Sequence, residues 1–80
     1  MMKELFENNE IEVETSGTEC PIPVLKARKV CQNASKGQII KVITTDPLAE
    51  ADFRHYCDQS NYKFISISKI KKTFYIKFKV

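Results

Sequence analysis

The sequence predicts an α+β fold, a two-layer sandwich in which two helices pack on one face of a four-stranded mixed sheet. Stretches rich in β-branched residues alternate with two stretches whose apolar residues recur every three to four positions. Glycine, proline and asparagine separate these stretches, which gives the order β-α-β-α-β-β. A chain of 80 residues is long enough for one such domain and no more. We expect helices on one side of the sheet because each element has one apolar face to bury.

The predicted elements form a single domain at residues 11–80, behind a lead-in of residues 1–10 that we expect to be frayed. In the first strand Ile11 and Val13 alternate with glutamates, which predicts one buried face. In the last strand Phe74, Ile76, Phe78 and Val80 are predicted to point inward and the lysines outward. The predicted elements are a strand at 11–15, a helix at 21–34, a strand at 38–44, a helix at 47–60 and strands at 62–69 and 73–80.

Proline marks the start of both predicted helices, and in the second helix it follows an aspartate. Cys20 is expected at the N-cap of the first helix, with Pro21 at its first position, and Gly37 is expected to end it. Asp46 and Pro47 repeat this start signal for the second helix. The predicted buried faces are Val24, Ala27, Val30, Cys31 and Ala34 in the first helix, and Ala49, Phe53, Tyr56 and Cys57 in the second.

Charge and hydropathy exclude several classes of function. The 13 basic and 10 acidic residues give a net charge of +3, which favours acidic partners at close range but falls short of an extended nucleic-acid footprint. No apolar run approaches the roughly 20 residues that span a bilayer, and the first ten residues lack the apolar stretch of a signal peptide. We therefore expect a cytoplasmic protein without a membrane partner, whose three cysteines are free thiols.

The segment from Gly17 to Pro23 contains the most informative cysteine. A thiol at the positive end of a helix has a lowered pKa, and the thiolate is the nucleophilic form of cysteine. Pro21 and Pro23 stiffen the backbone beside Cys20, and Gly17 allows the preceding loop to turn sharply. The alternative is a small buried hydrophobic side chain, which is the commoner role of a single cysteine. The residues alone favour a reactive Cys20 but leave both readings open.

The run from Cys20 to Lys29 contains a Cys-Pro-x-Pro motif that resembles the TusA/SirA family of small sulfur-carrier proteins. Gly17, Gly37, the Thr45-Asp46-Pro47 run, Asp52-Phe53 and Cys57 continue the likeness over about 12–80. The resemblance implies a sulfurtransferase that carries sulfur as a persulfide on Cys20 and needs no cofactor or metal. It further implies a cysteine desulfurase as the sulfur donor and a relay protein as the acceptor, in tRNA 2-thiouridine synthesis or another sulfur-transfer pathway.

The remaining polar and sulfur-containing residues each have a structural and a functional reading. Cys31 and Cys57 are predicted to be core residues, because they lie on the apolar helix faces and lack Cys-x-x-Cys spacing with Cys20. The alternative for Cys57 is a resolving thiol close to Cys20. His55 is expected at a solvated helix position, since no cysteine or histidine spacing offers a metal site, and its alternative is a place in a docking surface. The basic residues after the cysteine either form a solvated helix face or dock an acidic partner; they are Lys26, Arg28 and Lys29.

Two alternative functions remain open at this stage. The chain could be a non-catalytic protein-interaction module in which Cys20 is only a helix cap. It could also be a small RNA-binding protein that uses the lysines of the last two strands, although exposed lysines on a sheet commonly serve solubility and protect its edges.

Overall fold

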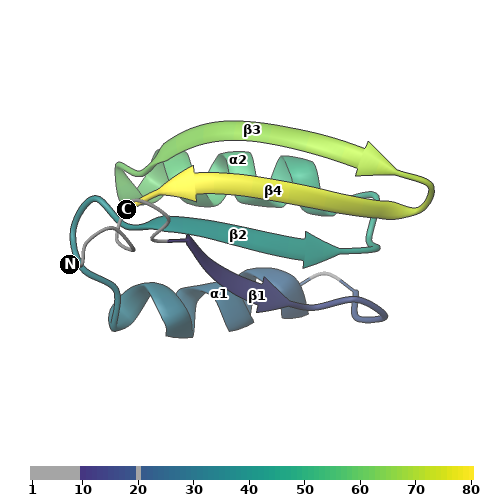
Figure 1. Ribbon diagram of the computed structural model, residues 1–80, viewed down its shortest axis with the longest axis horizontal. Helices are drawn as coiled ribbons and strands as arrows, with labels where there is room; N and C mark the ends of the chain where they lie inside the picture. The colour runs from purple at the N-terminus through teal and green to yellow at the C-terminus, as the bar shows by residue number, and fades with distance from the viewer. Residues whose placement is uncertain (1–9, 20) are drawn as a thin grey trace, which may run out of the picture.

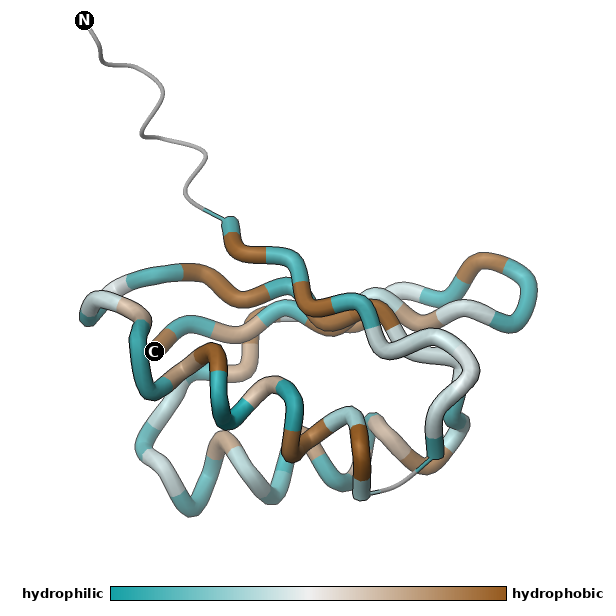
Figure 2. The backbone as a smooth tube through the Cα atoms, turned by 90° about the horizontal axis from the view of Figure 1, so that it is seen from below, coloured by the Kyte–Doolittle hydropathy of each residue, from teal (hydrophilic) through white to brown (hydrophobic). Residues whose placement is uncertain are grey.

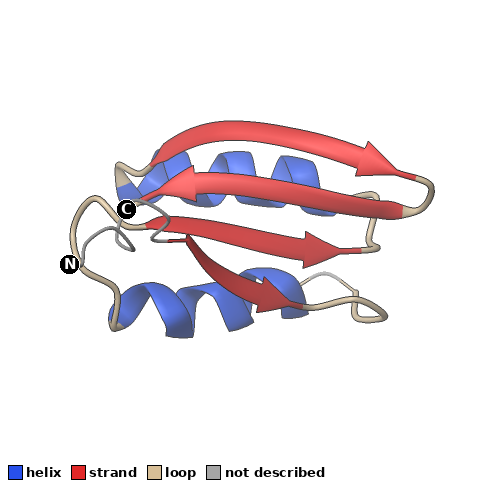
Figure 3. Cartoon of the chain, viewed as in Figure 1, coloured by secondary structure: helices blue, strands red, loops and turns tan. Residues whose placement is uncertain are grey.

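The computed structural model describes residues 10–19 and 21–80, and it has the predicted order of elements (Figures 1 and 3). Its elements are β1 (Glu10–Glu14), α1 (Ile22–Gln32), β2 (Ile39–Thr44), α2 (Ala49–Ser60), β3 (Lys63–Ile70) and β4 (Thr73–Lys79). No helix in the described part of the chain is long and apolar enough to cross a membrane.

The four strands form one mixed sheet in the order β1-β2-β4-β3, which confirms the predicted fold class. β1 runs parallel to β2, whereas β4 is antiparallel to both of its neighbours. Val13, Val42 and Ile76 are register partners across three strands, and all three side chains are buried. Both helices lie on the same side of the sheet, so the molecule has two layers (Figure 2).

The core fills the space between the sheet and the helices and is centred on aromatic side chains. Phe53 and Phe78 are both 0% exposed, and their ring centroids lie 5.9 Å apart. Tyr62 stacks on Phe78 at 5.9 Å, and Tyr56 meets the Tyr62 ring edge-on at 5.7 Å. Burying a side chain of this size stabilises a fold by about 1.5–3 kcal/mol, so this cluster anchors α2 to the sheet.

The helix boundaries differ from the sequence-based prediction by one or two residues. α1 begins at Ile22 with Pro21 at its N-cap, and α2 begins at Ala49 with Leu48 at its N-cap. The Asp46 carboxylate accepts a hydrogen bond from the amide of Leu48 at 3.0 Å, so it caps a turn that precedes the helix. The prediction that Asp46 is the helix N-cap is therefore wrong by two positions.

The predicted role of Gly37 is also wrong. α1 ends at Gln32 with Asn33 as its C-cap, four residues before Gly37. Gly37 has a φ of 90° and donates its amide to the carbonyl of Val80 at 2.7 Å, so its positive φ serves the turn into β2. At the end of α2 the left-handed C-cap is Asn61, with a φ of 61°.

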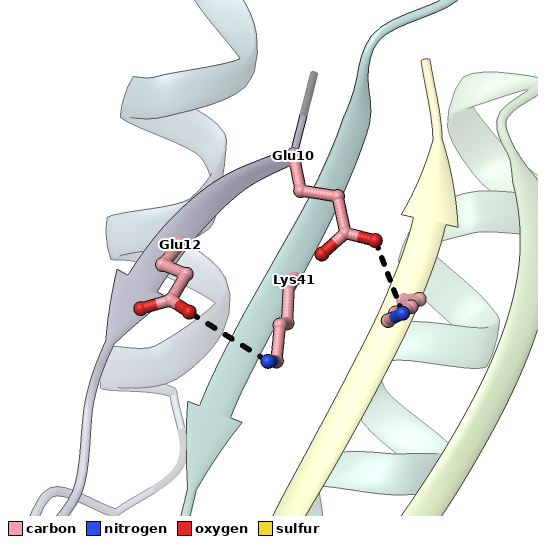
Figure 4. A network of polar contacts seen from close by, with 4 residues as sticks. Glu10, Glu12 and Lys41 are labelled. Carbon is pink, nitrogen blue, oxygen red and sulfur yellow. Dashed lines mark hydrogen bonds and ion pairs between the residues drawn. The ribbon is translucent and has the colours of Figure 1, made fainter. Parts of the chain in front are cut away.

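The face of the sheet that the helices leave open carries opposite charges that pair between neighbouring strands and across β2. Glu12 of β1 lies 3.6 Å from Lys41 of β2, and Glu10 lies 3.0 Å from Lys77 of β4 (Figure 4). These pairs are partly solvated, and such pairs contribute only ~0–1 kcal/mol each. These ion pairs lie on the sheet face opposite the helices, which neither α1 nor α2 covers.

Candidate functional site

The connections β1–α1 and β2–α2 meet at one edge of the sheet. β1 and β2 are parallel neighbours, and each is followed by a helix on the same side, so both helices begin at this edge (Figure 1). Cys20 belongs to the first connection but lies outside the described residues. The site is therefore built from the residues on either side of it and from the second connection.

Hydrogen bonds hold the β1–α1 connection against the end of β2. The amide and the hydroxyl of Thr15 both donate to the carbonyl of Ile43, at 2.8 and 2.7 Å. The amide and hydroxyl of Thr18 in turn donate to the carbonyl of Thr15, at 3.1 and 2.7 Å. Gly17 has a φ of 83°, and its amide donates to the Thr45 hydroxyl at 2.9 Å. These contacts give the backbone before the motif a defined path.

The β2–α2 connection forms the opposite side of a concavity of about 370 Å³. Its backbone is fixed by the amide of Asp46, which donates to the Thr44 hydroxyl at 3.1 Å, and by the amide of Ala49, which donates to the Asp46 carbonyl at 3.0 Å. The concavity is lined by Gly17, Thr18, Glu19, Thr45, Asp46, Pro47 and Leu48.

The residues that flank Cys20 in the chain, Glu19 and Pro21, are both exposed. The amide of Ile22 donates to the Glu19 carbonyl at 2.8 Å, and the amide of Leu25 donates to the Pro21 carbonyl at 3.1 Å. Because Pro21 and Pro23 have no N–H and the Ile22 amide is engaged, the first turn offers few free amides to an anion. The electrostatic support for an anion there comes mainly from the helix dipole.

Basic and apolar side chains share the surface around this turn. Lys26, Arg28 and Lys29 are exposed on α1, as predicted. Large apolar side chains are exposed beside them: Ile22 is 40% exposed and Leu25 is 48% exposed. Leu48 of the facing connection is 64% exposed. These three side chains, here called the apolar rim, were not singled out from the sequence.

The other two cysteines are core residues, as predicted. Cys31 is 7% exposed and Cys57 is 2% exposed. Burial, and to a lesser extent the neighbouring Cys31, raises the pKa of Cys57 to about 11. Burial also raises the pKa of Cys31, although a hydrogen bond with Tyr56 acts in the opposite direction. Both thiols are therefore poor nucleophiles at neutral pH.

His55 is exposed on α2, as expected. Among residues 10–19 and 21–80, no group of three or more His, Cys, Asp or Glu side chains could hold a metal ion.

A groove of about 630 Å³ runs between α1 and α2, with Pro21 among its lining residues. Sequence reasoning did not find it, because it forms only when the two helices pack side by side. Its lining residues are Pro21, Val24, Arg28, Cys31, Gln32, Asp52, His55, Tyr56, Gln59, Ser60 and Tyr62.

Comparisons with known proteins match this chain to sulfur carriers. A family model described as sulfurtransferase TusA matches residues 11–80. A sulfur carrier protein TusA from Allochromatium vinosum is 41% identical over 49 residues, which cover 61% of this chain and 64% of that protein, just under two thirds of its length. A protein of Neisseria meningitidis that is named as a candidate sulfur carrier is 30% identical over 57 residues, covering 71% of this chain and 77% of that protein.

A solved structure shares the fold. The SirA-like protein from Desulfitobacterium hafniense superposes with a TM-score of 0.76 at 17% identity, and the match covers 86% of this chain and 95% of that one. At this identity the likeness shows the common two-layer fold alone.

Proposed function

This chain belongs to the TusA/SirA family of sulfur carriers, and from that premise we propose that Cys20 takes up sulfane sulfur as a persulfide and passes it to an acceptor protein. The donor is a cysteine desulfurase, and the acceptor is a relay protein of tRNA thiolation or of another sulfur-transfer pathway in the cytoplasm. The observation that carries the proposal is the Cys-Pro-x-Pro motif at Cys20 within a family match that spans residues 11–80.

The chemistry needs one nucleophile and no redox partner. The Cys20 thiolate attacks the terminal sulfur of the donor persulfide, R–S–SH. The donor S–S bond breaks, the donor leaves as a thiolate, and Cys20–S–SH forms, so no net oxidation occurs. The same exchange in the next step transfers the sulfur to an acceptor thiolate. The α1 dipole favours the anionic forms of both thiol and persulfide at the start of that helix.

The surroundings of the motif support a carrier that meets two protein partners in turn. Glu19 and Pro21 are exposed, so partners can reach the backbone on both sides of Cys20. The apolar rim of Ile22, Leu25 and Leu48 offers contact area to a partner surface. The exposed basic side chains of α1 would attract acidic partner surfaces and raise the association rate: they are Lys26, Arg28 and Lys29.

Intact mass spectrometry tests the proposal directly. We expect the protein to gain the mass of one sulfur atom after incubation with a cysteine desulfurase and cysteine, and to lose it again on treatment with a reductant. Cys20→Ser should gain none, whereas Cys31→Ala, which keeps Cys20, should gain sulfur like the wild type. Sulfur gain by Cys20→Ser would move the carrier role away from Cys20, and no gain by the wild type would leave a non-catalytic interaction module.

A further inference from the structure

The groove between α1 and α2 brings Arg28 of α1 and Asp52 of α2 to one site, and the protein relay gives no role to Asp52 or to the groove itself. We propose that this groove binds a small α-amino-acid persulfide, such as cysteine persulfide or glutathione persulfide, which loads Cys20 without a protein donor. The inference rests on the proposed function, because it assumes that Cys20 accepts sulfane sulfur.

Opposite charges line the groove from its two sides. Arg28 comes from α1 and Asp52 from α2, and both line the groove. Neither side chain makes a hydrogen bond or ion pair with another residue of 10–19 or 21–80. An α-amino acid carries a carboxylate and an ammonium on one carbon. Arg28 suits the carboxylate because a guanidinium can donate two parallel hydrogen bonds, and Asp52 suits the ammonium.

The size and lining of the groove fit a molecule of this class. Its volume of about 630 Å³ lies within the ~300–1,000 Å³ range of small-molecule sites. Val24, Tyr56 and Tyr62 contribute apolar surface for the methylene carbon and the sulfur atoms of the ligand. The Tyr56 ring packs edge-on against Tyr62 at 5.7 Å and Phe78 at 6.1 Å, so this surface is held in place before a ligand binds.

The charge pattern favours a free amino acid over a loop of a protein donor. A residue inside a polypeptide has neither a free α-carboxylate nor a free α-ammonium, so Arg28 and Asp52 would find no matching backbone charges in such a loop. The groove also includes Pro21, the residue after Cys20 in the chain.

The chemical step is the exchange already described, with a small thiol as the leaving group. Cys20–S⁻ and R–S–SH give Cys20–S–SH and R–S⁻, with one S–S bond broken and one formed.

Binding can be tested apart from the chemistry with unreactive probes. S-methylcysteine and S-methylglutathione both carry the zwitterion but cannot donate sulfur, and we would titrate each into Cys20→Ser while following backbone amide shifts by NMR. We expect saturable shifts in Gln32 and Gln59, which line the groove, with a Kd on the order of 1 mM. The tighter probe identifies the physiological ligand source. Absence of saturable shifts with both probes would overturn the inference.

Matched variants assign the binding to the two charges. Arg28→Lys keeps the net charge but loses the planar fork, and Asp52→Asn removes the partner of the ammonium. Each should raise the Kd roughly five- to tenfold. Lys36→Gln and Asp58→Asn remove exposed charges outside the groove and should bind like the parent. Equal weakening in these controls would refute a specific role of the groove charges.

Loading kinetics separate this inference from the proposed function. The donor here is cysteine persulfide or glutathione persulfide, whichever corresponds to the S-methyl probe that binds more tightly. The rate of wild-type loading should saturate with its concentration. Arg28→Lys should raise the half-saturating concentration of this donor by the same factor as it raises the Kd of the probe. If desulfurase loads Cys20 but small persulfides load it without saturation, only the groove inference fails. If no donor loads Cys20, the proposed function fails, whatever the probes show. Slower desulfurase loading in both groove variants, with unchanged loading from the small persulfide, would assign the groove to the protein donor.

Discussion

The two buried cysteines should resist alkylation while the protein stays folded. Cys57 is 2% exposed, and its pKa is raised to about 11. At pH 8 about one Cys57 in a thousand is then a thiolate, against about a quarter of an ordinary thiol with a pKa near 8.5. Ionisation alone therefore slows its alkylation by roughly 200-fold, and exclusion of the reagent from the core slows it further.

An iodoacetamide time course at pH 8 measures this effect, with peptide mass mapping to assign the label. We expect Cys20 to react first, Cys31 later and Cys57 last, because Cys31 is the more exposed of the two buried thiols and lines the α1–α2 groove. The control is the same protein in guanidinium chloride, where burial is lost and the rates of Cys31 and Cys57 should converge.

Labelling of native Cys57 within tenfold of its rate in the unfolded chain would refute the reasoning. Such a rate would mean that the thiol is neither buried nor held protonated, and that a second nucleophile competes for sulfur. Alkylation of the native protein at Cys20 alone would instead support a carrier with a single reactive thiol.

Three further predictions concern the loop, the buried thiols and the basic face. Gly17→Ala should cost about 1–2 kcal/mol of unfolding free energy from its φ of 83° alone, since nothing lies within 4 Å of the added Cβ, and it should slow sulfur loading. Gly37→Ala, at a φ of 90° far from the motif in the chain, should cost as much in denaturant titrations yet load at the wild-type rate. Because burial raises the pKa of Cys57 to about 11, its contribution to stability is complete below the ordinary thiol pKa near 8.5 and is lost as pH rises towards 11. Denaturant titration at pH 10 should therefore show a loss of about 1–2 kcal/mol, and an unchanged value would contradict this. Lys29→Glu should slow loading by desulfurase severalfold at low salt and little at high salt, whereas Lys72→Glu on the β3–β4 turn should not; a salt-independent defect would argue against steering.

The order of the elements could be predicted because each strand and helix buries one face. Apolar residues therefore recur every second position in strands and every three to four positions in helices. Ile76 and Phe78 were expected inside and are both 0% exposed. The residues that mark helix starts and stops predicted the helix boundaries less reliably, since the same residue types also occur in turns outside helices. Asp46 caps the turn before α2, and Gly37 serves the turn into β2.

The parts of the site that escaped prediction depend on residues far apart in the sequence. The Thr45 hydroxyl accepts a hydrogen bond from the amide of Gly17, a contact that exists only because β1 and β2 are parallel neighbours. The groove likewise requires Arg28 and Asp52 to come together from different helices. Neither residue lies on a buried helix face, so the spacing of apolar residues could not predict that they would meet. The motif at Cys20 was found because its chemistry is local in sequence.

The sheet order has a consequence for how the chain folds during synthesis. β4 comes last of the six elements along the chain, yet it lies between β2 and β3 in the sheet. Until residues 73–79 have left the ribosome, β2 and β3 have no shared neighbour, and the parallel β1–β2 pair must close a loop that contains all of α1. Pairings distant in sequence form slowly because the entropy of loop closure precedes the gain from contacts. We therefore expect the ribosome-bound chain to remain sensitive to protease until β4 emerges and joins β3 to the β1–β2 pair.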